Sequence, residues 1–194
     1  FKRALSINEQ VLGPTHKEVA QNLFNLGAFL VDVEGRAAEA IPLYQRAIGI
    51  LQVALGSDND DMAMALGNLA VADRGLGQNA EAERMQRQAL AIREKVFGPE
   101  HADVALGLNN LGVLYADDKR WDDAEKAQLR SLAIWEKVSG PDNPQVAYPL
   151  NSLGLVYLGT GNPSPWSGPV GGGERKDGLY TASIVAVRVK DGAY

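Results

Sequence analysis

The sequence contains no cysteine, so disulfide frameworks, thiolate zinc sites and cysteine nucleophiles are excluded. This absence says little about the compartment, and we expect a cytoplasmic protein. Clustered lysine and arginine are also missing, and the formal net charge is −5, which argues against nucleic acid or an anionic membrane as a partner. No run of about 18 apolar residues occurs, so no membrane span is predicted.

A repeat of about 42 residues runs through the chain, a period typical of repeat arrays. One motif, ALSI at its first occurrence, begins at Ala4, Ala47, Ala89 and Ser131. A second motif, GPTH at its first occurrence, begins at Gly13, Gly56, Gly98 and Gly140. Because one repeat cannot bury its apolar face alone, consecutive repeats are expected to stack and share a core.

Each repeat is predicted to contain two helices. In the third repeat, Leu108, Leu111 and Tyr115 have the i, i+3, i+7 spacing of one helix face, which predicts a helix over about 102–117. A second helix is predicted over about 121–138, ending near a glycine that can adopt a left-handed conformation.

The turn between the two helices of a repeat also has a matching position, which holds Gly35, Gly77 and Lys119. A positive φ at this position costs a lysine about 1 kcal/mol relative to glycine. The third repeat is therefore predicted to have the weakest of these turns.

His101 lies among Glu94, Glu100 and Asp103, a grouping that a metal or proton-transfer site would also show. Its counterparts in the other repeats are His16, Asn59 and Asn143. Asparagine replaces histidine easily at a helix N-cap, and acidic residues in the following turn favour the positive end of a helix. We therefore interpret these four residues as N-caps, with no metal bound.

The segment Leu111-Gly112-Val113-Leu114-Tyr115, with Ala124 after it, resembles the signature of the tetratricopeptide repeat family. The phrase "ALAIREKVFGPEHADVALGLNNLGVLY" resembles the 42-residue subtype found in kinesin light chains. This resemblance implies an all-α fold, an α-solenoid of stacked antiparallel helix pairs. HEAT and armadillo arrays have comparable periods but lack this pattern, and they are the alternative fold.

The repeat array is expected to cover residues 1–161. It divides into a partial repeat at 1–13, full repeats at about 14–56, 57–98 and 99–140, and the first helix of a last repeat at 141–161. Because both ends then leave apolar faces uncovered, we expect a fragment of a longer protein that self-associates or frays at those ends.

Residues 162–194 are predicted to form a Gly/Pro-rich, non-helical linker and tail. Alternating valines predict one β-strand over 180–189. That strand is the start of another domain, a disordered tail, an intermolecular strand or a non-native terminus. The glycines of "GPVGGGERK" do not have the spacing of a phosphate-binding loop, and no cofactor is expected.

The resemblance implies a non-catalytic scaffold that binds a protein or peptide segment in a concave groove formed by the first helix of each pair. The face opposite the predicted core mixes amide and apolar side chains instead of charges. We predict that peptide-binding residues on this face are Asn25, Asn68, Asn110, Ser152, Met64, Leu106, Tyr148, Val71 and Val113. Alternatively, these apolar residues pack on the adjacent repeat and the asparagines form hydrogen bonds between helices.

The sequence also bears on three other functions. Chaperone-tail receptors of the same family clamp a carboxylate with basic residues, but the equivalent positions here include Met64 and Leu106, so that activity is not expected. With both histidines at caps and no cysteine, an enzyme is not expected either. The second hypothesis is a structural or regulatory arm of a larger signalling protein whose effector domain lies elsewhere.

Overall fold

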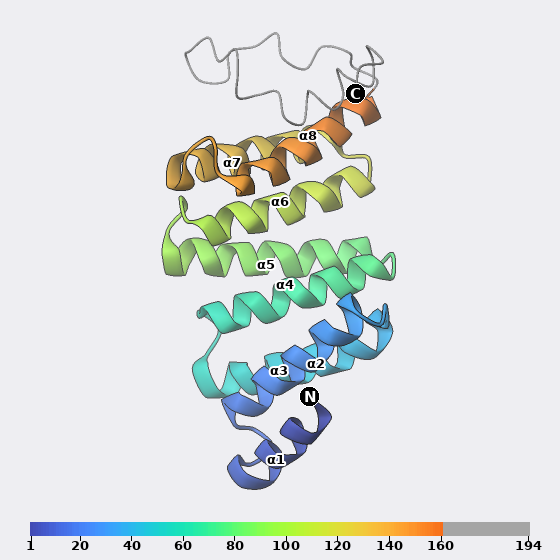
Figure 1. The fold of residues 1–194 in the computed structure, drawn as a ribbon, viewed down its shortest axis with the longest axis vertical. Helices are drawn as coiled ribbons and strands as arrows, with labels where there is room; N and C mark the ends of the chain where they lie inside the picture. Colours follow the sequence, from blue (N-terminus) through green and yellow to red (C-terminus); the bar gives the residue numbers. More distant parts are fainter. Residues whose placement is uncertain (161–194) are drawn as a thin grey trace. The chain divides into compact units, whose positions relative to one another are not determined.

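The computed structural model describes residues 1–160, which are divided between two compact units, residues 1–99 and residues from 100 onward. Unit 1 contains α1 (Lys2–Leu12), α2 (Lys17–Asp32), α3 (Ala37–Leu55), α4 (Asp60–Gly75) and α5 (Asn79–Phe97) (Figure 1). Unit 2 contains α6 (Ala102–Asp117), α7 (Trp121–Ser139), the short 3-10 helix η1 (Pro144–Val146) and α8 (Ala147–Thr160). We call α2, α4, α6 and α8 the first helices, and α1, α3, α5 and α7 the second helices.

The helices pack as pairs within each unit. In unit 1, α2 packs against α3 and α4 against α5, while α3 also packs against α4 and α1 against α2. In unit 2, α6 packs against α7, and both contact α8. These contacts confirm the predicted all-α fold of stacked helix pairs. The predicted linker and strand of 162–194 lie outside the described residues.

The predicted helix face of the third repeat is buried. Leu108, Leu111 and Tyr115 all point into the core of unit 2, and α6 and α7 have nearly the bounds expected from the sequence. A second cluster joins α7 to the last helices through Leu132, Val146, Leu150 and Leu153. Burial of such side chains is the main stabilising contribution in an array of this kind.

Two glycines of the signature allow close approach of a second helix. A Cβ atom on Gly27 would lie 2.7 Å from the Tyr44 ring, and one on Gly112 would overlap the Gln128 side chain. Gln128 Nε2 donates a hydrogen bond to the Asn109 carbonyl at 2.9 Å. The buried amide of α7 therefore occupies the space that Gly112 leaves on α6, which fixes how the two helices meet.

Side-chain caps begin the first helices, as predicted. The Nδ1 atoms of His16 and His101 accept hydrogen bonds from the backbone N–H groups of Glu18 and Asp103, at 3.2 and 3.3 Å. Asn59 accepts from the backbone N–H of Met62 at 2.9 Å, and Asn143, which caps the short helix η1 before α8, accepts from that of Gln145 at 3.0 Å. The interpretation of His101 as an N-cap is confirmed, because its acceptor atom is engaged by the helix.

The positive φ predicted at Lys119 is also confirmed. Lys119 has a φ of 59°, and its counterparts Gly35 and Gly77 have φ values of 63° and 74°. Lysine thus adopts the left-handed conformation for which the other two repeats use glycine.

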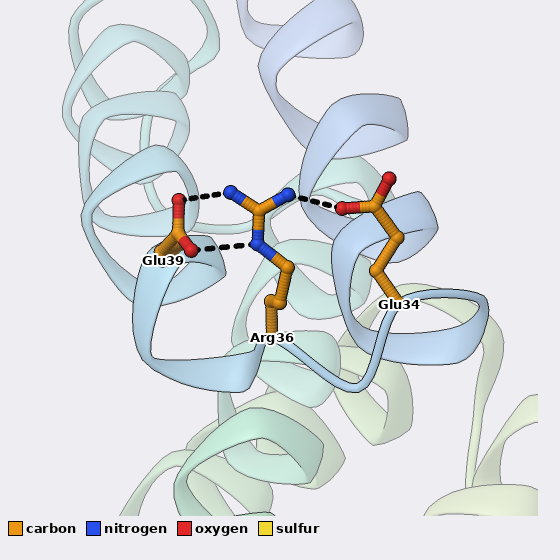
Figure 2. A network of polar contacts seen from close by, with 3 residues as sticks. All are labelled: Glu34, Arg36 and Glu39. Carbon is orange, nitrogen blue, oxygen red and sulfur yellow. Dashed lines mark hydrogen bonds and ion pairs between the residues drawn. The ribbon is translucent and has the colours of Figure 1, made fainter.

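The first of these turns contains one extra residue, Glu34. The guanidinium of Arg36 donates to both oxygens of the Glu39 carboxylate at 2.6 Å and also pairs with Glu34 (Figure 2). The hydrogen bonds from Arg36 hold the pKa of Glu39 below its usual value. All three side chains are exposed, so this network orders the turn more than it stabilises the fold.

Candidate functional site

The predicted binding residues lie on one face of the first helices, which we call the stripe. None of them is buried. The half-buried members are Asn25, Met64, Asn68, Asn110, Val113 and Ser152, and the exposed members are Val71, Leu106 and Tyr148. The stripe is therefore accessible on each helix. Several of its residues are large and apolar, whereas the exposed face of a helix usually carries polar or charged residues.

In unit 1 the stripe borders a hollow of about 110 Å³. Gln21 and Met64 line it from α2 and α4, together with Ala20, Phe24 and Leu51. The charged residues Lys17, Glu18 and Asp61 also line it. A single water needs roughly 10–15 Å³ of such space, so the hollow has room for a side chain of several atoms.

Phe24 and Leu51 were not among the predicted site residues. The counterparts of Phe24 in the other repeats are Gly67, Asn109 and Asn151. Comparison of the repeats therefore did not predict an apolar side chain at this position. Leu51 is on a second helix, and only the tertiary packing brings it beside α2 and α4. The one signal in the sequence for this part of the hollow was the aromatic side chain of Phe24, which comes three residues after Gln21 on the same helix.

The four polar residues predicted on the stripe, Asn25, Asn68, Asn110 and Ser152, fall into two groups. Asn25 Oδ1 accepts a hydrogen bond from Gln21 Nε2 at 3.1 Å, and Ser152 Oγ donates to Asn109 Oδ1 at 3.3 Å. These two positions therefore have partners inside the protein. The side-chain amides of Asn68 and Asn110 have no hydrogen-bond partner among residues 1–160, so both retain donors and acceptors for a ligand.

In unit 2 the stripe is predominantly apolar. Leu106 on α6 is 40% exposed and Tyr148 on α8 is 58% exposed. Leu155 on α8, which we add to the stripe as the counterpart of Val113, is 66% exposed. Helix α8 carries no acidic or basic residue, and the charged residues of α6 are Asp103 in its first turn and Asp117 at its C-terminal end. Exposed apolar residues grouped in this way are typical of interaction surfaces.

The acidic residue Asp73 is buried away from the stripe. Asp73 in α4 is 3% exposed, at the position that holds Leu30 and Tyr115 in neighbouring repeats. Burial raises the pKa of Asp73, and the negative charge of Glu81 raises it further. The second repeat thus departs from the family signature where an apolar or aromatic side chain is expected.

The described residues offer no grouping for metal chemistry. Among residues 1–160, no three or more histidine, aspartate or glutamate side chains lie where they could hold a metal ion. In the same part of the chain, no helix combines the length and apolar character needed to cross a membrane.

Comparisons with known proteins identify the repeat. The family model for the tetratricopeptide repeat matches residues 25–95, 61–126 and 103–165. A search of curated proteins by sequence gave no match.

Solved structures with the same fold include proteins of the kinesin light chain type. One, from Podosopora anserina, is described as a kinesin light chain with nearly identical TPR-like repeats; it is 22% identical, with a TM-score of 0.67 over 75% of this chain and 69% of that chain. A variant of it gives 20% identity and a TM-score of 0.72 over 98% of this chain and 84% of that chain.

BtubC (BKLC) from P. vanneervenii is 26% identical, with a TM-score of 0.69 over 91% of this chain. The present chain spans 64% of the length of BtubC. At these identities the structures establish the architecture, while the chemistry of the stripe depends on the residues of this chain.

Proposed function

Because the chain belongs to the tetratricopeptide repeat family, we propose that it is a non-catalytic scaffold that binds a protein or peptide segment along the stripe. Repeats of this family generally mediate protein–protein interaction. The first helices of such repeats form the concave groove of the array, and the stripe lies on these helices. The partner is an extended segment whose backbone and side chains contact the stripe at the same time.

The observation that carries this proposal is the pairing of unpartnered amides with exposed or half-buried apolar side chains on the same helix faces. Asn68 lies between Met64 and Val71 on α4, and Asn110 lies between Leu106 and Val113 on α6. An amide side chain both donates to and accepts from a peptide backbone, while the flanking residues contact the peptide's side chains. A merely solvated face would carry charges at these positions.

The affinity of such a site is limited by the ordering of the ligand. The hollow in unit 1 is small and open, so an extended segment forms few buried contacts there. These contacts only partly offset the conformational entropy that the segment loses on binding. A dissociation constant on the order of micromolar is expected.

The proposal is tested with the full chain and a random short-peptide library displayed on phage. Enriched peptides are synthesised with a fluorophore, and their binding is measured by anisotropy. The double change Asn68→Ala with Asn110→Ala removes the unpaired amide of the stripe from each unit, so a peptide bound to either unit loses one hydrogen bond of about 1 kcal/mol and is expected to bind about fivefold more weakly. The control is Gln45→Ala with Gln88→Ala, which removes two exposed amides from the second helices.

Thermal melts monitored by circular dichroism establish that both double variants remain folded. Absence of any enriched peptide would count against the scaffold function itself. Equal affinity of the wild type and the Asn68/Asn110 double variant would reject the stripe as the site while leaving the function in place.

A further inference from the structure

The two units present different chemistry on their first helices. In unit 1, three charged side chains, Lys17, Glu18 and Asp61, line the hollow beside the stripe. In unit 2, the stripe is apolar and amide-bearing, and its three most exposed large side chains are Leu106, Tyr148 and Leu155. This difference is independent of the hydrogen-bonding pattern on which the proposed function depends.

The charge content of α6 and α8 restricts what can dock there. Helix α8 has no acidic or basic side chain, so a charged ligand group lying on it would lose hydration without meeting an opposite charge. Loss of hydration by an unpaired charge is strongly unfavourable. The acids of α6, Asp103 in its first turn and Asp117 at its last residue, lie at the two ends of that helix, away from Asn110 in the middle.

The geometry suits a short extended segment. Tyr148 and Leu155 are seven residues apart on α8, which corresponds to about 10 Å along the helix axis. An extended chain rises about 3.3 Å per residue, so its alternate side chains, which point the same way, are about 6.6 Å apart, and a segment of about four or five residues spans that distance. Because α8 packs against α6, the same segment also comes within reach of Leu106 and the free amide of Asn110.

Building on the proposed function, we infer that the segment docking on the α6–α8 face is uncharged and carries apolar side chains at alternate positions. Its apolar side chains cover Leu106, Tyr148 and Leu155, and its backbone bonds to the Asn110 amide. A neutral ligand matches a neutral face, because neither side leaves an unpaired charge buried. Acidic and basic segments are excluded from this face for the same reason.

The peptide selection distinguishes these classes directly. Peptides enriched on the full chain that lose affinity when Leu155 is replaced by glutamate are assigned to the α6–α8 face. Their sequences are expected to be neutral, with leucine, valine or aromatic residues at alternate positions. Enrichment of acidic or basic sequences among this group would overturn the inference and leave the proposed function intact.

Two further measurements sharpen the result. From about 0.05 to about 0.5 M NaCl, the affinity of an assigned peptide is expected to change by less than about twofold, because no ion pair is available for salt to screen. Leu155→Glu and Leu155→Lys are expected to weaken it alike, by at least about tenfold. Weakening by one sign of charge only would show that the peptide's own charge matters and would contradict the inference.

The control is Val33→Glu, which introduces the same charge at an exposed valine just after α2, outside the stripe. It is expected to leave binding unchanged. If no peptide at all is enriched, the proposed function fails. If peptides are enriched and depend on the two asparagines but none responds to Leu155→Glu or Leu155→Lys, only the inference about the α6–α8 face fails.

Discussion

Replacement of Lys119 should increase the stability of this chain, because Lys119 adopts a φ of 59° where the two preceding repeats have glycine. The left-handed conformation costs an L-residue about 1–2 kcal/mol. Replacing Lys119 by glycine removes that cost but gives the unfolded chain extra freedom, which offsets about 0.4–1 kcal/mol of the gain. The expected net stabilisation of Lys119→Gly is therefore about 0.5–1 kcal/mol.

Nothing else at this position opposes the substitution. The backbone N–H of Lys119 donates to the Ala116 carbonyl at 3.0 Å, and glycine keeps that bond. The lysine side chain is exposed and has no hydrogen-bond or ion-pair partner among residues 1–160, so its removal breaks no contact. Lys119→Ala is the matched control, because it removes the same side chain while retaining the strained φ.

Urea denaturation followed by far-UV circular dichroism measures the effect, with the slope checked for constancy across the variants. Lys119→Gly is expected to raise the free energy of unfolding and the melting temperature, the latter by about 1–4 °C for a chain of this size. Lys119→Ala is expected to have little effect. A glycine variant no more stable than the alanine variant would refute the assignment of strain to this turn.

Three other substitutions test the packing and the caps. Gly112→Ala is expected to destabilise unit 2 by about 1–3 kcal/mol in thermal melts, because the new Cβ overlaps Gln128. Recovery of stability in the double variant with Gln128→Ala would identify the overlap as the cause. An unchanged stability of the single variant would contradict the prediction. Asp73→Leu is expected to stabilise unit 1 by about 1–3 kcal/mol near pH 7. Burial raises the pKa of Asp73 in the folded state, so the destabilisation caused by Asp73 grows as the pH rises above about 3.9, the pKa in the unfolded chain. The stabilisation gained by Asp73→Leu, measured by urea titration, should therefore shrink toward about pH 3.5. A stabilisation that does not depend on pH would show that the buried charge is not its cause. His101→Ala is expected to cost about 1 kcal/mol and His101→Asn much less, because asparagine can accept the same backbone bond; equal losses in melting temperature would show that the cap is not what matters.

The features that the sequence predicted correctly depend on local rules. The N-cap of His101 follows from its place before an apolar helix pattern, and the positive φ of Lys119 follows from glycine in the other repeats at the same position. Both structures are set by residues within one turn of the chain, although the signal for Lys119 was read from the other repeats. Repetition strengthens them, because each rule can be checked several times along one chain.

The features that the sequence missed depend on contacts between distant residues. Leu51 lines the hollow only because α3 brings it beside α2 and α4, and Gln128 reaches the Asn109 carbonyl only because Gly112 leaves space. Asp73 is charged, yet the position that it occupies is buried by the packing of its repeat. Helix periodicity identifies which face is buried but not which substitution the face tolerates.

The contrast between buried and stripe positions supports the interpretation of the stripe as a contact surface. The alanines at the start of the first helices, Ala20, Ala63 and Ala105, are identical and at most 1% exposed, since any larger side chain there would separate a helix from its partner. One residue later, on the stripe, the side chain changes from Gln21 through Met64 and Leu106 to Tyr148. Packing therefore does not determine this position, and leucine or tyrosine exposed to water adds little to folding stability. We interpret the variation and the apolar character as fitted to a ligand whose chemistry differs from one repeat to the next, so changes at Leu155 and Asn110 should alter binding far more than stability.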